Sequence, residues 1–132
     1  MINRIHHVNF LVRDLTNCTT YMTSLLGIEP ELSCLPERYV KTATYKLGEC
    51  YLVLVSPTSE LGEPARILKE KGPGLFLISF STPNIDTTLS ALKNFGINTA
   101  SPRRQGLENW IVQDLTSPDD LGAIIQLCET TI

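Results

Sequence analysis

The sequence predicts an α+β fold in which two tandem β-α-β-β-β modules form one curved, half-open barrel. Three observations lead to this prediction: one residue pattern occurs twice, each copy changes from strand to helical spacing, and a helix-capping residue stands at each change. Two modules that each leave a sheet face uncovered are expected to pair their sheets. We expect a single domain, with module one over about 1–58, a linker over about 59–73 and module two over about 74–132.

The repeat relates residues 5–30 to residues 75–100. Each segment opens with β-branched, aromatic and other apolar residues, which suit a strand. Asp14 and Asn84 then stand at matching places, where a short polar side chain can cap a helix. Apolar residues follow at helical spacing, at Leu15, Cys18, Tyr21, Met22, Leu25 and Leu26 in one copy and Ile85, Leu89, Leu92 and Phe95 in the other.

The ends of the two predicted helices are marked by glycines. Gly27 and Gly96 can adopt the left-handed conformation that follows a last helical turn. A further strand is expected directly after each of them. The linker carries a short predicted helix around Ala65–Lys69, which ends before a Gly-Pro-Gly sequence.

Each module is expected to close with two strands. Residues 39–57 alternate in a way that predicts two strands with a turn near Gly48. Residues 109–129 predict a second pair, opened by Trp110 and joined by a turn over 117–122. The last strands of both modules therefore complete the predicted β-α-β-β-β order.

Composition excludes several function classes. The net charge of −3 argues against a nucleic-acid partner, which calls for a basic patch. No apolar run reaches the roughly 20 residues of a membrane span, and no secretory signal is visible at the N-terminus, so a cytoplasmic protein without a membrane partner is expected. The four cysteines form no C-x-x-C pair and are expected to be reduced, buried thiols.

Short motifs resemble a known superfamily. The I-x-H-V motif at 5–8, V-R-D-L at 12–15 and L-L-G-I-E-P at 25–30 are similar to the N-terminal signature of the vicinal-oxygen-chelate (glyoxalase, bleomycin-resistance and dioxygenase) superfamily. Residues 47–80 resemble most closely the methylmalonyl-CoA epimerase branch. The resemblance implies a glyoxalase-like fold, and it implies a homodimer because members of the fold often dimerise.

The resemblance also implies four positions for a divalent metal ion. They fall on His7, Val53, Leu77 and Gln126. Val53 and Leu77 are hydrocarbons that cannot donate a lone pair, and two neutral ligands hold a divalent ion poorly. A register slip of one residue would not help, because the neighbours Leu52, Leu54, Phe76 and Ile78 are not ligands either. We therefore expect no metal at this place and no cofactor.

Strand alternation predicts what the pocket contains instead. His7 and Asn9 share one face of the first strand, while His6 is expected on the opposite face. The expected ligand-binding residues of a mostly apolar cleft are His7, Asn9, Val53, Leu77, Ser79 and Gln126. In the alternative interpretation, His7 is a core histidine that forms a hydrogen bond with Gln126 or Asn9 and binds nothing.

Other conspicuous residues have two interpretations each. The face shared by Tyr39, Lys41, Ala43 and Tyr45 is expected to close the cleft, with the alternative that Tyr39 and Tyr45 only cover the sheet. Trp110 fits packing or a dimer interface better than a ligand platform. The charges of Lys41, Arg103 and Arg104 are expected in solvent, unless one of them meets a carboxylate or phosphate on a ligand.

Three functions are compatible with these observations. The first is a metal-free protein that binds a small organic molecule. The second is an isomerase or lyase of the methylmalonyl-CoA epimerase or glyoxalase type, which acts on a thioester or carbonyl compound. His7 would then be the catalytic residue that moves a proton, and Gln126 or Asn9 would hold the oxyanion. The third is an interaction module whose sheet edges form a dimer.

Overall fold

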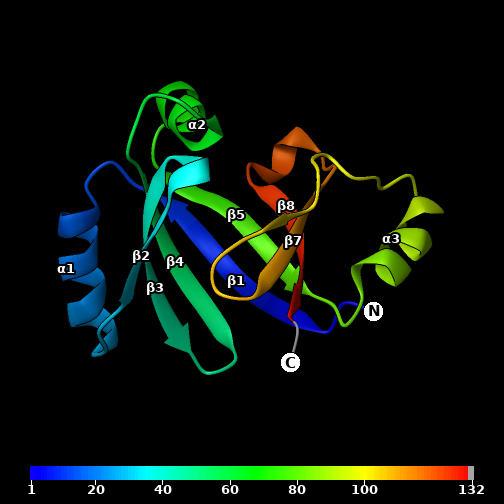
Figure 1. Cartoon of the computed structure of the whole chain (residues 1–132), viewed down its shortest axis with the longest axis horizontal. Coiled ribbons are helices and arrows are strands. Elements are labelled where there is room, and N and C mark those ends of the chain that lie inside the picture. Colours follow the sequence, from blue (N-terminus) through cyan, green and yellow to red (C-terminus); the bar gives the residue numbers. More distant parts are fainter. Residues whose placement is uncertain (131–132) are drawn as a thin grey trace. The chain divides into compact units, whose positions relative to one another are not determined.

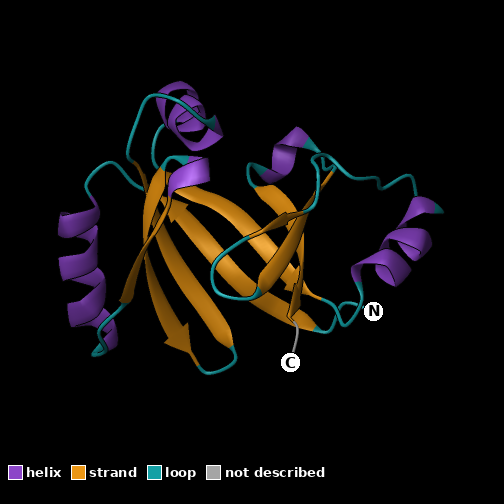
Figure 2. Ribbon diagram, in the orientation of Figure 1, coloured by secondary structure: helices purple, strands orange, loops and turns teal. Residues whose placement is uncertain are grey.

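The computed structural model of the chain describes residues 1–130 (Figures 1 and 2). The elements are β1 (Arg4–Leu11), α1 (Leu15–Leu26), β2 (Glu31–Leu35), β3 (Val40–Leu47), β4 (Cys50–Pro57), α2 (Glu63–Lys71), β5 (Gly74–Ser81), α3 (Ile85–Lys93), β6 (Arg104–Gln105), β7 (Trp110–Leu115) and β8 (Ile124–Thr130). The predicted α+β class and the twofold β-α-β-β-β order are confirmed. The helix of the linker, α2, is longer at both ends than predicted.

The chain forms two compact units that do not coincide with the two modules. One unit is Val8–Phe76, and the other combines Met1–His7 with the chain from Leu77 onward. Strands β1 and β5 therefore each contribute residues to both units. Among the described residues, no helix is long and apolar enough to cross a membrane.

The unit Val8–Phe76 has the strand order β2-β3-β4-β1, and both hairpin pairs are antiparallel. Helix α1 lies against β3 and β4 (Figure 1). The core between them contains the buried Ala43, Tyr45 and Leu54. Apolar residues at the predicted helical spacing, including Leu15, Cys18, Met22 and Leu26, pack against this core.

Ala43 and Tyr45 therefore cover the sheet, and the prediction that they close the cleft is wrong. The Tyr45 side chain reaches α1, where its hydroxyl donates to Thr19 O at 3.1 Å and lies 2.8 Å from Thr23 Oγ1. The physical reason is the register of β3, which turns alternate residues toward α1.

The predicted N-terminal caps are confirmed. Asp14 accepts a hydrogen bond from the main-chain N of Asn17 at 3.0 Å, and Asn84 accepts one from Thr87 at 2.9 Å. Each cap satisfies an N–H group that the first turn of a helix leaves without a partner.

Both predicted glycines adopt the left-handed conformation, with φ 78° at Gly96, but only α1 extends as far as its glycine. Gly27 caps α1 in the left-handed conformation, with φ 72°. Helix α3 instead ends at Lys93, before Gly96. Phe95, which was expected to belong to the apolar stripe, is 80% exposed, so no packing continues the helix to the glycine.

The second unit has the strand order β1-β5-β8-β7-β6. Strand β8 is parallel to β5 and antiparallel to β7. Helix α3 covers one face of these strands, where Ile85, Leu115 and Leu127 are buried (Figure 2). Because side chains alternate along a strand, Gln126 and Cys128 point to the face opposite Leu127 and α3.

Candidate functional site

Three polar residues form a row across β5, β8 and β7. Gln126 is in register with Ser79 on one side and Asp114 on the other. Its Nε2 donates to Asp114 Oδ1 at 2.9 Å. Arg104 donates to the same carboxylate through Nη1 at 3.3 Å and Nη2 at 3.4 Å. The buried negative charge of Asp114 is therefore compensated, and Gln126 is oriented by its bond to it.

Two atoms of this row have unused hydrogen-bonding capacity. Ser79 Oγ and Gln126 Oε1 are buried and have no hydrogen-bond partner within the described part of the chain. A buried polar atom without a partner costs about 1–3 kcal/mol, and native proteins usually satisfy it with water or a ligand. The row can therefore accept a hydrogen bond at Gln126 Oε1 and either donate or accept one at Ser79 Oγ.

His6 and His7 form a buried pair in the same unit. Their Nδ1 atoms are 2.9 Å apart, so in a hydrogen bond one ring donates and the other accepts. The Trp110 ring stacks on His7 with centroids 4.6 Å apart, and it meets His6 edge-on at 4.7 Å. The prediction that His6 faces away is wrong. Alternation directs the Cα–Cβ bonds of neighbouring residues apart, but these two rings meet against Trp110.

Burial keeps both imidazoles neutral. Desolvation, followed by the charge of His6, lowers the pKa of His7 to about 3, although the Gln126 amide favours the protonated ring. Desolvation and the positive charge of Arg4 lower the pKa of His6 to about 4. At pH 7 both rings are therefore uncharged, and His7 is a weak base.

Cys128 lies next to the histidine pair. One ring nitrogen of His6, one of His7 and the sulfur of Cys128 lie within 4.8 Å of one another, and all three residues are buried. Burial raises the pKa of the Cys128 thiol to about 12. All four cysteines are free, as predicted, but the prediction that they are buried holds for Cys128 alone: Cys18 and Cys50 are half-buried and Cys34 is exposed.

The structure places the six predicted binding residues in two groups. His7, Leu77, Ser79 and Gln126 belong to one unit, and Asn9 and Val53 belong to the other. Ser79 and Gln126 are adjacent in register, and the Gln126 side chain is close enough to His7 to affect its pKa. Asn9 Oδ1 is a third buried oxygen with no partner among residues 1–130. Val53 and Leu77 are buried hydrocarbons.

Sequence reasoning missed Asp114. The predicted turn over 117–122 could have indicated it, because a hairpin centred on this turn pairs Asp114 with Gln126. It also misjudged Arg104, which was expected in solvent but pairs with this carboxylate. Arg103 meets a carboxylate too, that of Asp86 at 2.6 Å, on the surface of the protein.

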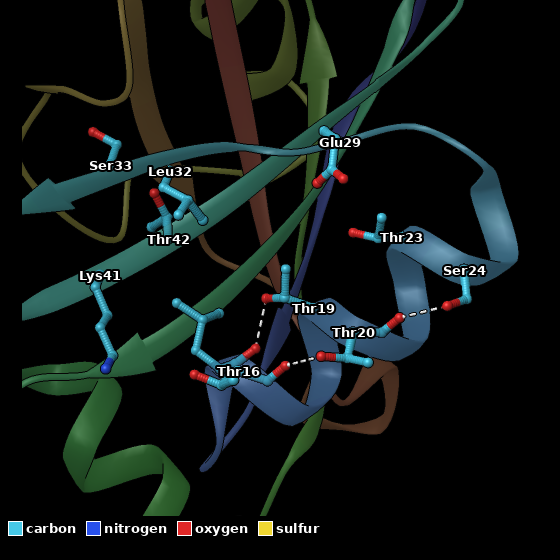
Figure 3. A pocket seen from close by; sticks show the side chains of 11 residues that line it. Thr16, Thr19, Thr20, Thr23, Ser24, Glu29, Leu32, Ser33, Lys41 and Thr42 are labelled. Atoms are coloured by element: carbon cyan, nitrogen blue, oxygen red, sulfur yellow. Dashed lines mark hydrogen bonds between the residues drawn. The ribbon is translucent and has the colours of Figure 1, made fainter.

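A separate groove lies in the unit Val8–Phe76 (Figure 3). It has a volume of about 610 Å³ and runs between α1, β2 and β3. It is lined by Leu15, Thr16, Thr19, Thr20, Thr23, Ser24, Glu29, Leu32, Ser33, Lys41 and Thr42, which include none of the six predicted binding residues. The hydroxyls of Thr19, Thr20 and Ser24 donate to carbonyls one turn earlier in the helix, so their hydrogens are already used.

Comparisons with known proteins agree with this fold. The structure is similar to a Streptomyces coelicolor methylmalonyl-CoA epimerase variant in complex with 2-nitronate-propionyl-CoA, with a TM-score of 0.89, 23% identity and 100% of each chain covered. It is also similar to methylmalonyl-CoA epimerase from Mycobacterium tuberculosis, with a TM-score of 0.87, 21% identity and coverage of 99% of this chain and 90% of that chain.

A third similar structure is a hypothetical protein from Bacillus halodurans, with a TM-score of 0.89, 21% identity and coverage of 98% of this chain and 95% of that chain. A comparison with curated proteins gives no significant match. The sequence profile described as Glyoxalase/Bleomycin resistance protein/Dioxygenase superfamily matches residues 6–113. The predicted glyoxalase-like fold is thus confirmed, and the chain belongs to the glyoxalase/bleomycin resistance protein/dioxygenase superfamily.

Proposed function

We propose that this chain binds a small organic molecule beside His7, Ser79 and Gln126, without the divalent ion that the resemblance implies. The donor set does not fit such an ion, because Val53 and Leu77 occupy two of its four positions and offer only carbon atoms. Recognition would then depend on shape and on a few hydrogen bonds.

The observation that carries this proposal is the pair of buried oxygens, Ser79 Oγ and Gln126 Oε1, on neighbouring strands. A ligand with a donor group would satisfy Gln126, and the Ser79 hydroxyl would serve either a donor or an acceptor. Asp114 is already compensated by Arg104, so the row favours no strongly charged group. We expect an uncharged polar ligand group at this row, next to the apolar Leu77.

The low basicity of His7 favours binding over proton transfer. A general base works best when its pKa is near the operating pH. The pKa of His7 is lowered to about 3, mainly by burial, so its neutral ring has little tendency to take a proton at pH 7. Its ring is better suited to accept or donate one fixed hydrogen bond.

A second candidate is an isomerase or lyase that acts on an acyl-CoA thioester or another carbonyl compound. The observation that favours it is the Asp114 carboxylate, whose Oδ1 lies 2.9 Å from Gln126 Nε2. The site therefore contains a carboxylate, although Gln126 itself has none. The epimerases among the similar structures make methylmalonyl-CoA the first substrate to test. Incubation with it in D₂O, followed by mass spectrometry, would reveal exchange of the α-proton. No exchange above the uncatalysed rate would exclude this candidate for that substrate.

The binding proposal is tested by a metabolite screen. Protein purified without added ligand is examined by native mass spectrometry and then by thermal shift against neutral polar metabolites. A hit should bind at least about 5-fold more weakly to Gln126→Leu and Ser79→Ala, because each loses one hydrogen bond. Ser24→Ala, in the groove of the other unit, is the matched control and should not change the affinity. Equal binding by all variants would contradict the proposal.

We also propose that the chain is a single domain and forms a homodimer, as the resemblance implies. Light scattering coupled to size-exclusion chromatography should give a mass near twice the 14.7 kDa of one chain. A concentration-independent mass of one chain would contradict the dimer.

A further inference from the structure

Three side chains that can bind a metal ion lie close together in the second unit. His6 and His7 come from β1, and Cys128 comes from β8. One ring nitrogen of each histidine and the Cys128 sulfur lie within 4.8 Å of one another, and each residue is at least 97% buried. This grouping is not the set of positions that the resemblance implies, with which it shares only His7.

The distances suit a single ion. In a tetrahedral zinc site, bonds of about 2.0–2.1 Å to nitrogen and 2.3 Å to sulfur place two nitrogens roughly 3.3 Å apart and a nitrogen and a sulfur roughly 3.6 Å apart. The two Nδ1 atoms are 2.9 Å apart, so a small rotation of either ring would bring them to this spacing. The Cys128 sulfur lies within 4.8 Å of a ring nitrogen of each histidine, so it would move slightly closer to them when the ion binds.

The chemistry of the ligands selects the kind of ion. Two imidazoles and a thiolate are borderline to soft donors, which favour Zn²⁺ over Mg²⁺ or Ca²⁺. Trp110 stacks on His7 and packs edge-on against His6, so both rings are held in orientation before an ion arrives. We propose that His6 Nδ1, His7 Nδ1 and Cys128 Sγ bind one thiophilic divalent ion, with Zn²⁺ as the best match.

Binding has a defined proton balance. The Cys128 thiol forms a bond from sulfur to the ion and releases its proton to solvent. The proton that the two imidazoles share at Nδ1 moves to Nε2 of the ring that carried it, so that both Nδ1 lone pairs face the ion. Three protein ligands leave one tetrahedral position for a water molecule or a ligand atom. This inference goes beyond the proposed binding function and does not depend on it.

Cobalt substitution tests the site with a direct optical signal. Chelator-treated protein titrated with Co²⁺ should bind one ion and develop a sulfur-to-cobalt charge-transfer band, which Zn²⁺ then displaces. Cys128→Ala should abolish this band, and His6→Ala should weaken Co²⁺ binding at least 10-fold. Cys34→Ala, which removes an exposed thiol in the other unit, should behave like the wild type.

Gln126→Ala distinguishes this site from the one that the resemblance implies. An ion held by Cys128 should retain its charge-transfer band in this variant, whereas an ion held at His7 and Gln126 should be lost. X-ray absorption of the zinc-loaded wild type needs no variant and should show one sulfur and two imidazoles. Absence of stoichiometric Co²⁺ and Zn²⁺ binding, or a zinc shell without sulfur, would overturn the proposal.

Discussion

Gln126 Nε2 and Asp114 Oδ1 are joined by a buried hydrogen bond of 2.9 Å between adjacent strands. This bond directs the amide nitrogen of Gln126 toward β7 and leaves its oxygen, Oε1, without a partner among the described residues. Gln126 occupies a position at which the resemblance implies a metal-binding carboxylate, and it presents a neutral acceptor there. The carboxylate itself lies one strand away and is compensated by Arg104.

Removal of the Asp114 carboxylate should destabilise the fold. Asp114→Ala leaves the Gln126 amide and the partly buried Arg104 without their acceptor, and we expect a loss of about 2–4 kcal/mol in the free energy of unfolding. Asp119→Ala, at an exposed turn position, should change it by no more than about 0.5 kcal/mol. Urea unfolding of both variants checks this, and equal losses would contradict the role given to Asp114.

Ser79→Ala should leave the stability unchanged or increase it by up to about 1 kcal/mol, although the residue is fully buried. The reason is that its hydroxyl has no hydrogen-bond partner among the described residues, so the substitution removes a buried polar atom and not a bond. The same variant should weaken ligand binding. A loss of more than about 1 kcal/mol in urea unfolding would mean that the hydroxyl is satisfied in the free protein.

The histidine pair should make the metal-free protein less stable in acid. The pKa values are about 4 for His6 and about 3 for His7 in the folded chain, against 6.5 without burial. Below pH 6.5 the two histidines bind protons in the unfolded chain but not in the folded chain. The free energy of unfolding therefore falls as the pH decreases from about 6.5 toward 3. Above this window the contribution is complete.

Unfolding curves between pH 4 and 7.5, recorded with a chelator present, measure this effect. A His7→Leu variant should show a shallower decline, because only His6 then titrates between the two states. A slope that is unchanged in His7→Leu would assign the acid sensitivity to other groups.

Tyr45 should contribute to stability through its hydroxyl. Tyr45→Phe removes the hydrogen bonds to Thr19 O and Thr23 Oγ1 while keeping the ring in the core, and we expect a loss of about 1–2 kcal/mol. Tyr21 has an exposed ring, so Tyr21→Phe is a matched control with an expected change below about 0.5 kcal/mol. Thermal unfolding of the two variants compares them directly.

The sequence alone was enough to predict most of the local structure, although α3 ends before Gly96 and β6 begins at Arg104 instead of directly after that glycine. The repeat, the caps at Asp14 and Asn84 and the turns near Gly48 and 117–122 all depend on residues close together in the chain, and each is present in the structure. The carbon-only side chains of Val53 and Leu77 were also evident from the sequence, because ligand chemistry depends on residue type.

The tertiary structure decided which side chains meet. Asp114, Gln126 and Ser79 are far apart in the chain, and only the registers of β7, β8 and β5 bring them into one row. The contact between His6 and His7 contradicts simple alternation, because the Trp110 ring packs against both. Residue type and spacing determine local conformation, whereas hydrogen-bond partners and pKa values depend on the side chains that neighbouring strands supply.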